Sequence, residues 1–222
     1  EATRFTIETA RVVSLNLESV APSGSSAAKK QSAIMYMLAR HALMSRCRIE
    51  EEILDTVPEK YREYYLERMK LLGPEVKIFS YDEFHRTSGI EGFCNQIERD
   101  IREGRKYNTQ TLIFSQDPDD YSDIMVEFST TQFILGAGGD RVSGTDRGVQ
   151  LARRFGLSES DLRIIDRLRG PTKEGAMAFM IAKTKEGNCK MLVYNTIGAS
   201  ERWALETNAW NRALRDRVVS RL

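Results

Sequence analysis

Apolar residues recur along the chain with two different periods, and the period changes from one segment to the next. Residues 27–46 and 90–101 have apolar side chains at helical spacing, and Ser25 or Ser26 can cap the first of these predicted helices. Shorter runs that are rich in β-branched and aromatic residues predict strands. These runs are residues 11–18, 76–81, 109–115 and 132–135.

Helical segments separate these strands. Thr56 and Glu59 have the spacing of a capping box and predict a helix that ends at Gly73, and residues 120–128 predict a shorter helix. Strands that alternate with helices favour right-handed crossovers between parallel strands. The sequence therefore predicts an α/β fold with a mostly parallel sheet flanked by helices.

The pattern changes in the last third of the chain, where a hairpin and more helices are expected. The predicted elements are helices at residues 146–155, 158–168 and 207–222 and strands at residues 176–183 and 189–196. Gly187 marks the turn of the hairpin. In the last helix, we expect Trp210, Leu214 and Val218 to pack inward and the arginines to face outward.

Composition narrows the class of protein. With 222 residues, 41% of them hydrophobic and 29% charged, the chain can bury a core, and we expect residues 1–222 to form a single domain. The net charge of +1 lacks the basic excess of a dedicated nucleic-acid binder. No stretch approaches the roughly 18 apolar residues of a membrane-spanning helix, so no membrane span is expected.

Cysteine and histidine are scarce. The three cysteines lie far apart and the histidines number two, which indicates neither a disulfide framework nor a zinc site. A cytoplasmic protein is expected. Because the sequence begins at Glu1 without an initiator Met, we also expect it to be a fragment of a longer protein.

The strongest local signal is a pair of carboxylates at the end of a predicted buried strand. Asp82 and Glu83 directly follow residues 76–81, and ligands of open α/β sheets bind at the carboxyl ends of the strands. There an Asp can bind Mg²⁺ through water, and a neighbouring Glu can polarise an attacking water, as in the Walker B element of nucleotide hydrolases. The alternative is that the two acids only cap the following loop.

Three further residues extend this hypothesis. Gln116 ends the next predicted strand, where its amide can sense a γ-phosphate or hold the attacking water, although such a Gln is also typical of a turn. Arg102 and Arg105 lie at the end of a predicted helix and are candidates for an arginine finger acting on a neighbouring subunit, or they only stabilise the helix dipole. The phosphate-binding pattern G-x-x-x-x-G-K-[ST] is missing from the sequence.

Several short stretches of the chain resemble one known family. They are residues 11–15, 20–22, 35–40, 80–83, 105–108, 115–118, 201–205 and 212–215. The most specific are the two C-terminal stretches, with the sequences ERWAL and RALR. They resemble the type IVB secretion ATPases of the DotO (IcmB)/TraU family, whose wider relatives are the VirB-type energising ATPases. The likeness runs over essentially the whole chain.

The resemblance implies the C-terminal part of a RecA-like motor that lacks its Walker A segment, which in the family lies upstream. It implies ATP and Mg²⁺ as cofactors of the longer protein, with Asp82 binding Mg²⁺ through water, Glu83 as the base and Gln116 as the sensor. It also implies a homo-hexamer at the cytoplasmic side of the bacterial inner membrane. Its partners would be other secretion ATPases, inner-membrane components, and protein effectors or a DNA–protein substrate. The chain alone is expected to be inactive.

Two alternative functions come from other classes. One is a non-catalytic docking or assembly domain of the secretion machine, and the other is a translocase module that grips DNA. ATP turnover by the longer protein separates the first from a motor, and salt-dependent DNA binding identifies the second. The nearly balanced charge argues against the DNA module.

Overall fold

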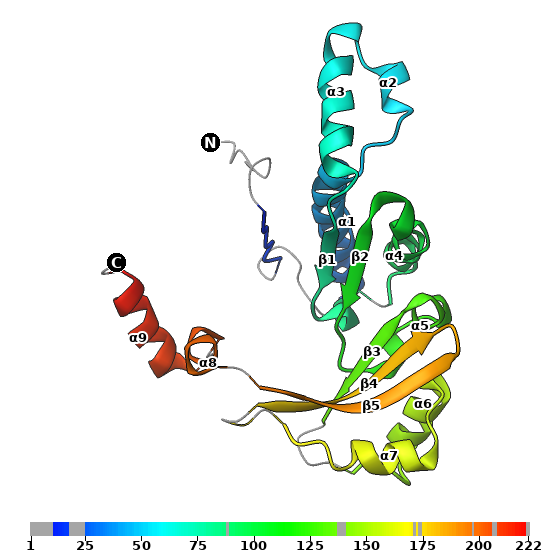
Figure 1. Cartoon of the computed structure of the whole chain (residues 1–222), viewed down its shortest axis with the longest axis vertical. Coiled ribbons are helices and arrows are strands. Elements are labelled where there is room, and N and C mark those ends of the chain that lie inside the picture. Colours follow the sequence, from blue (N-terminus) through cyan, green and yellow to red (C-terminus); the bar gives the residue numbers. More distant parts are fainter. Residues whose placement is uncertain are drawn as a thin grey trace. The chain divides into compact units, whose positions relative to one another are not determined.

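The structure is a computed structural model with a mixed α/β fold (Figure 1). It describes residues 11–17, 25–87, 89–136, 141–170, 172, 175–196, 198–205 and 208–220. The chain divides into two compact units, Glu1–Phe128 and Ser129–Leu222, which are described separately below. Two compact units can still belong to one folding domain, so the single-domain expectation stays a prediction.

The first unit is mainly helical. In chain order its elements are α1 (Ser26–Cys47), α2 (Ile53–Thr56), α3 (Glu59–Leu72), β1 (Lys77–Tyr81), α4 (Glu91–Glu103), β2 (Thr109–Ile113) and α5 (Asp123–Phe128). Short 3-10 turns lie at Phe84–Arg86, Gly104–Tyr107 and Pro118–Asp120. Ser25 caps α1 as predicted, because its hydroxyl oxygen accepts a hydrogen bond of 3.2 Å from the N–H of Ala28.

The strands β1 and β2 pair in parallel, and α4 lies between them in the sequence as the crossover helix. The register places Lys77 opposite Thr109 at one end and Tyr81 opposite Ile113 at the other. Apolar side chains of α1 and α4 cover one face of this pair, and the core residues are Phe84, Phe93, Ile97 and Met125. On the other face Ile78 remains exposed, which is unusual for parallel strands.

The second unit contains an antiparallel sheet. Its elements are β3 (Thr131–Leu135), α6 (Asp146–Phe155), α7 (Glu159–Ile165), β4 (Ala176–Thr184), β5 (Gly187–Asn195), α8 (Ala199–Leu205) and α9 (Ala209–Val219). The strand order is β3-β4-β5, and both pairings are antiparallel. β4 and β5 form the predicted hairpin, whose turn uses Gly187 at a φ of +133°.

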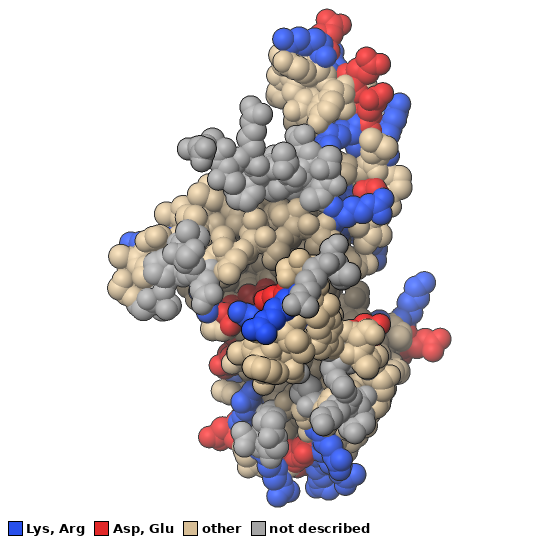
Figure 2. All heavy atoms as spheres, turned by 90° about the vertical axis from the view of Figure 1, so that its left-hand side faces the viewer, with Lys and Arg blue, Asp and Glu red and all other residues tan. Residues whose placement is uncertain are grey.

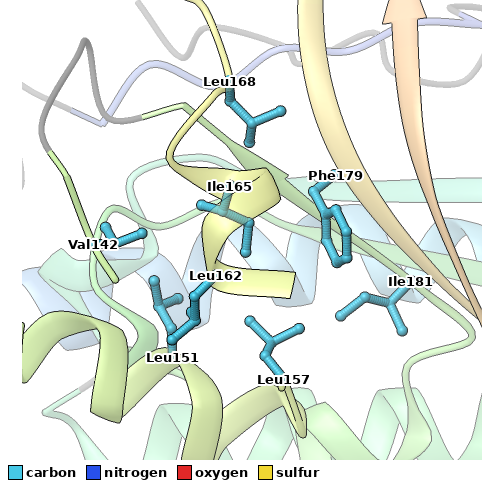
Figure 3. Close-up of a cluster of buried hydrophobic side chains, with 8 residues drawn as sticks. All are labelled: Val142, Leu151, Leu157, Leu162, Ile165, Leu168, Phe179 and Ile181. Atoms are coloured by element: carbon cyan, nitrogen blue, oxygen red, sulfur yellow. The ribbon is translucent and has the colours of Figure 1, made fainter. Parts of the chain in front are cut away.

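The core of this unit lies between one face of the sheet and the two helices α6 and α7 (Figure 3). The buried side chains that meet there are Val142, Leu151, Leu157, Leu162, Ile165, Leu168, Phe179 and Ile181. Ser158 begins α7 with a complete capping box, since its hydroxyl accepts from the N–H of Asp161 while the Asp161 carboxylate accepts from the N–H of Ser158. The predicted helices of this region are confirmed.

The sheet differs from the prediction. The sequence predicts one mostly parallel sheet, whereas among the described residues the structure has a two-stranded parallel sheet and a separate antiparallel sheet. β3 follows the second crossover segment but pairs with the β4–β5 hairpin instead of β2. Alternation of helices and strands identifies the elements, but the hairpin formed later in the sequence offers β3 a distant antiparallel partner that this pattern does not reveal.

The strand predicted at residues 11–18 is wrong over its described part. Residues 11–17 adopt no strand, Val12 is 88% exposed, and residue 18 lies outside the described residues. A β-rich pattern is a local property, whereas a strand also needs a neighbour to pair its backbone groups. The part of the sheets that the structure describes provides no neighbour for this segment.

Two predictions about helices are also wrong, one about the start of α3 and one about the packing of α9. Thr56 does not cap the following helix but ends α2, and α3 begins after Pro58 without a side-chain cap. Trp210 of α9 is 76% exposed, and Leu214 and Val218 are exposed with it. The helical period shows which residues share a face, but it does not show that another element covers that face. The predicted ends of this helix, at residues 207 and 221–222, lie outside the described residues.

Candidate functional site

The two parallel strands of the first unit bring Asp82 and Gln116 to the same edge of one sheet. Asp82 directly follows β1, and Gln116 lies three positions after Ile113, the last residue of β2. Because Tyr81 is paired with Ile113, both strands end at the same level, and both polar residues are exposed there. The expected position at one sheet edge is found, whereas a common cleft between these residues and their catalytic roles stay predictions.

The backbone turns sharply at Glu83, directly after this strand. Glu83 has a left-handed conformation with φ 51° and ψ 46°, and its N–H donates a hydrogen bond of 2.9 Å to the Asp82 carboxylate. The N–H of Phe84 then donates to the carbonyl of Phe114, 2.9 Å away, beyond the end of β2. The turn after β1 is therefore tied to the end of the neighbouring strand, which holds the two acids at the sheet edge.

The carboxylate of Glu83 is paired with the guanidinium of Arg86, with a distance of 2.7 Å between Oε2 and Nε. Both side chains remain partly exposed to solvent. In this geometry the Glu83 carboxylate contacts Arg86, so it can reach a bound water only after this pair opens.

Gln116 belongs to a structured turn. The Ser115 hydroxyl donates a hydrogen bond to the Asp120 carboxylate, and the Asp117 carboxylate accepts one of 2.9 Å from the N–H of Asp119. These bonds fix the 3-10 turn Pro118–Asp120 that follows Gln116. The turn interpretation and the sensor interpretation are therefore compatible, since Gln116 is an exposed residue at the sheet edge.

The structure does not bring Arg102 and Arg105 to this edge. Both residues are exposed and lie at the end of α4 and in the turn that leads into β2, next to the amino ends of the strands. A strand of this length separates the two edges by about 15 Å. The Arg102 guanidinium instead lies 6.0 Å from the centre of the Phe128 ring. An arginine finger from this position would have to act on another subunit.

Sequence reasoning missed a buried ion-pair network in the first unit. The carboxylate of Asp100, only 2% exposed, accepts a hydrogen bond of 2.7 Å from Nε of Arg40 and lies 3.5 Å from Nη1 of Arg48. The Arg48 guanidinium also pairs with Glu103 and stacks 3.9 Å from the centre of the Tyr107 ring. No sequence signal connects residues that lie about 50 to 60 positions apart and belong to different helices.

The network affects the adjacent aromatic side chain of β1. Burial, followed in size by the negative charge of Asp100, raises the pKa of Tyr81 to about 12.

Next to the network, a surface hollow of about 280 Å³ is lined by Arg40, His41, Met44, Ser45, Arg48, Glu50, Gln96 and Arg99. The acids Glu50, Asp100 and Glu103 pair with the arginines around it, so the hollow is not an uncompensated anion site.

Two further properties of the described residues concern metal binding and membrane insertion. None of them form a cluster of three or more His, Cys, Asp or Glu side chains that could hold a metal ion. None of their helices combines the length and the apolar character needed to cross a bilayer. In comparisons with family models, curated proteins and solved structures, nothing matches this chain.

Proposed function

We propose that this chain is part of a nucleotide-hydrolysing motor that powers substrate transfer through a type IVB secretion or conjugation system. The observation that supports the proposal is the position of Asp82 and Gln116 after adjacent parallel strands, at one sheet edge. Nucleotide hydrolases use this arrangement for a Mg²⁺-directed acid and a water-positioning amide. The proposal keeps the RecA-like motor fold and the family resemblance as hypotheses.

A single Asp at the sheet edge is compatible with Mg²⁺, because that ion keeps several waters and is usually held by one or two carboxylates together with the phosphates of the nucleotide. Bound Mg²⁺-ATP would supply the neutralised phosphate at which water attacks. Within this chain, Asp82 would hold a metal-bound water, and Glu83, released from Arg86, would accept the proton of the attacking water. Gln116 would orient that water.

The same proposal includes the setting of the motor. The longer protein would assemble as a homo-hexamer at the cytoplasmic side of the bacterial inner membrane, beside other secretion ATPases and inner-membrane components. Protein effectors or a DNA–protein complex would be its cargo. In such a ring Arg102 or Arg105 could reach the nucleotide of the neighbouring subunit, which agrees with their distance from Asp82 within one chain.

Replacement of the proposed base in the longer protein tests the function. Glu83→Gln should lower steady-state ATP turnover by about 100-fold or more, because a general base contributes at least that factor, while nucleotide binding and assembly persist. The matched control is Glu67→Gln on the exposed surface of α3, which makes the same change of charge and should leave turnover unchanged. Equal turnover in both variants would exclude Glu83 as the base.

The isolated chain provides the second part of the test. It contains no phosphate-binding loop, so calorimetric titration with Mg²⁺-ATP should detect no tight binding. Micromolar binding by residues 1–222 would reveal a phosphate site within this chain. It would contradict the proposal that the phosphate-binding segment of the motor lies upstream of residues 1–222.

An assembly domain is the second candidate function, and the exposed apolar face of α9 favours it. Trp210, Leu214 and Val218 share this face, and such surfaces mark sites of protein contact. A DNA-gripping module is less well supported. The face drawn in Figure 2 carries both Lys/Arg and Asp/Glu side chains, and the net charge of the chain is only +1, without the basic excess of a dedicated nucleic-acid binder.

A further inference from the structure

Among the described strands, β3 and β5 form the two edges of the antiparallel sheet, and β5 is the longer of the two. β5 spans nine residues, and β4 is the strand paired with it in the described part of the sheet. No other described strand pairs with the outer side of β5, so this side presents to the described part of the chain a row of backbone N–H and C=O groups that a further strand can pair. This edge is independent of the proposed nucleotide site, since it belongs to the second unit.

β5 lacks the features by which sheet edges usually avoid pairing with another chain. It contains no proline, and its register with β4 runs from Gly187 to Asn195 without a bulge. The single charged residue of the strand is Lys190, whose ammonium donates to the carbonyl of Gly156 at 2.9 Å and to the carboxylate of Asp161 at 2.6 Å. Its charge is therefore neutralised inside the unit and does not protect the edge.

The face of the sheet that points away from α6 and α7 is uncharged. Cross-strand partners share a face, so the register assigns to this outer face Thr131, Phe133, Leu135, Ala178, Met180, Ala182, Cys189, Met191 and Val193. The side chains of Phe133 and Leu135 are 59% and 69% exposed. On the opposite face of β5, Leu192 and Tyr194 are also exposed. Apolar side chains thus flank the unpaired edge on both sides.

We propose that β5 pairs in antiparallel orientation with β5 of a second copy of this chain, about a twofold axis at Met191, to form a continuous six-stranded sheet. Residue 191 is the midpoint of residues 187–195, so this register uses the whole strand. It places Lys190 opposite Leu192 of the second copy and Cys189 opposite Val193. No two like charges face each other, and both outer faces join into one apolar surface.

The alternative registers are less favourable. A twofold axis at Lys190 pairs only residues 187–193 and leaves Tyr194 and Asn195 outside the paired segment. Axes farther from Met191 leave a larger part of the nine-residue strand unpaired. The length of β5 therefore selects the register, and self-pairing about a twofold axis closes the interface so that it does not propagate into a fibre.

Cysteine cross-linking tests the register directly. At the axis the two copies of residue 191 are directly opposed with Cα atoms about 4.5–5.5 Å apart, within the range of a disulfide. Under mild oxidation, Cys189→Ser/Met191→Cys should form a covalent dimer. The matched control Cys189→Ser/Glu186→Cys carries its thiol in the hairpin turn, far from its counterpart, and should form no covalent dimer. Cross-linking of the control but not of the residue-191 variant would overturn the proposal.

Light scattering on the chain 1–222 tests the dimer itself. Met191→Lys should raise the dissociation constant at least about tenfold, because it places like charges at the axis. Phe133→Lys adds the same charge to the same face but on β3, away from the edge, and should leave the dimer intact. A monomeric wild-type chain at high micromolar concentration, or dissociation by Phe133→Lys alone, would refute edge pairing. Unchanged circular dichroism confirms that both variants remain folded.

Discussion

Each unit contains an aspartate with little solvent exposure, and different groups bind the carboxylate in the two units. In the first unit, the Asp100 side chain is 1% exposed and is held by the guanidinium groups of Arg40 and Arg48. In the second unit, Asp166 is 14% exposed and accepts hydrogen bonds from the N–H groups of Val142 and Ser143 at 2.6 and 3.1 Å. The Ser143 hydroxyl donates a third.

The difference concerns what each carboxylate organises. Asp100 joins α4 to Arg40 on α1 and to Arg48 just after it, so its loss leaves arginine charges in a partly buried site. Asp166 binds mainly backbone and a hydroxyl, so it fixes the loop that leads into α6 and adds little to the packing of helices. We therefore expect substitution of Asp100 to affect the fold of its unit and substitution of Asp166 to affect mainly one loop.

The largest effect should follow from Asp100→Ala. Removal of one partner of a buried ion pair typically costs about 3–5 kcal/mol, and the remaining exposure of Arg40 and Arg48 places the expected loss near the lower limit. Denaturant unfolding with hydrogen exchange over residues 25–128 measures it. The matched control, Asp55→Ala on the exposed surface of α2, should cost less than about 0.5 kcal/mol. Equal losses in both variants would contradict a structural role of the network.

An intermediate effect is expected from Gly148→Ala, which tests the loop that Asp166 holds. A Cβ atom at Gly148 would lie 2.1 Å from the carbonyl oxygen of Val142, so the loop or α6 would have to move. Such overpacking typically costs about 1–3 kcal/mol, measurable by denaturant unfolding. Gly170→Ala is the matched control, since a Cβ there has no neighbour within 4 Å, and it should be nearly neutral. A neutral Gly148→Ala would show that the loop adapts.

The second unit contains elements that the sequence predicts well and others that it does not. The helix that begins after Ser158 and the β4–β5 hairpin are predicted because their signals are local, namely a Ser at the N-cap followed by acids in the first turn, and a turn glycine. The partner of β3 and the exposure of Trp210 are not predicted, since each depends on which distant segment lies beside it. Features that depend on neighbouring residues can be predicted from the sequence, whether they are helices or strands. Features that depend on contacts between distant segments cannot.

The candidate site shows the same limit. Asp82 and Gln116 could be assigned to one sheet edge because parallel strands joined by a crossover end on the same side. Glu83 and Arg86 are only three positions apart in the sequence, but the sequence does not predict that they pair. The backbone turns at Glu83 through a left-handed conformation, which the local pattern does not reveal. Asp100 and its arginines had no local signal at all.

The smallest effect should be a pH dependence that comes from Asp166. The hydrogen bond from the Ser143 hydroxyl, together with those from the two backbone N–H groups, lowers the pKa of Asp166 below its ordinary value. The contribution of this carboxylate to stability is therefore complete above the unfolded-state pKa of about 4. It is lost as the pH falls from there through the lower pKa of the folded state.

Asp166→Asn keeps the shape of the side chain and removes this titration. We expect the difference in unfolding free energy between the wild type and Asp166→Asn to be largest near neutral pH and to shrink below about pH 4. Ser143→Ala, which removes the hydroxyl donor, should reproduce part of this change and so distinguish the hydrogen bond from a general effect of charge. Because Asp161 also has a lowered pKa, where hydrogen bonds from Lys190 and Ser158 outweigh the opposing effect of burial, the wild type alone does not isolate Asp166. A difference that stays constant between pH 7 and about pH 3 would mean that Asp166 titrates alike in the folded and unfolded chains, and that its hydrogen bonds fix the loop without favouring the charged form.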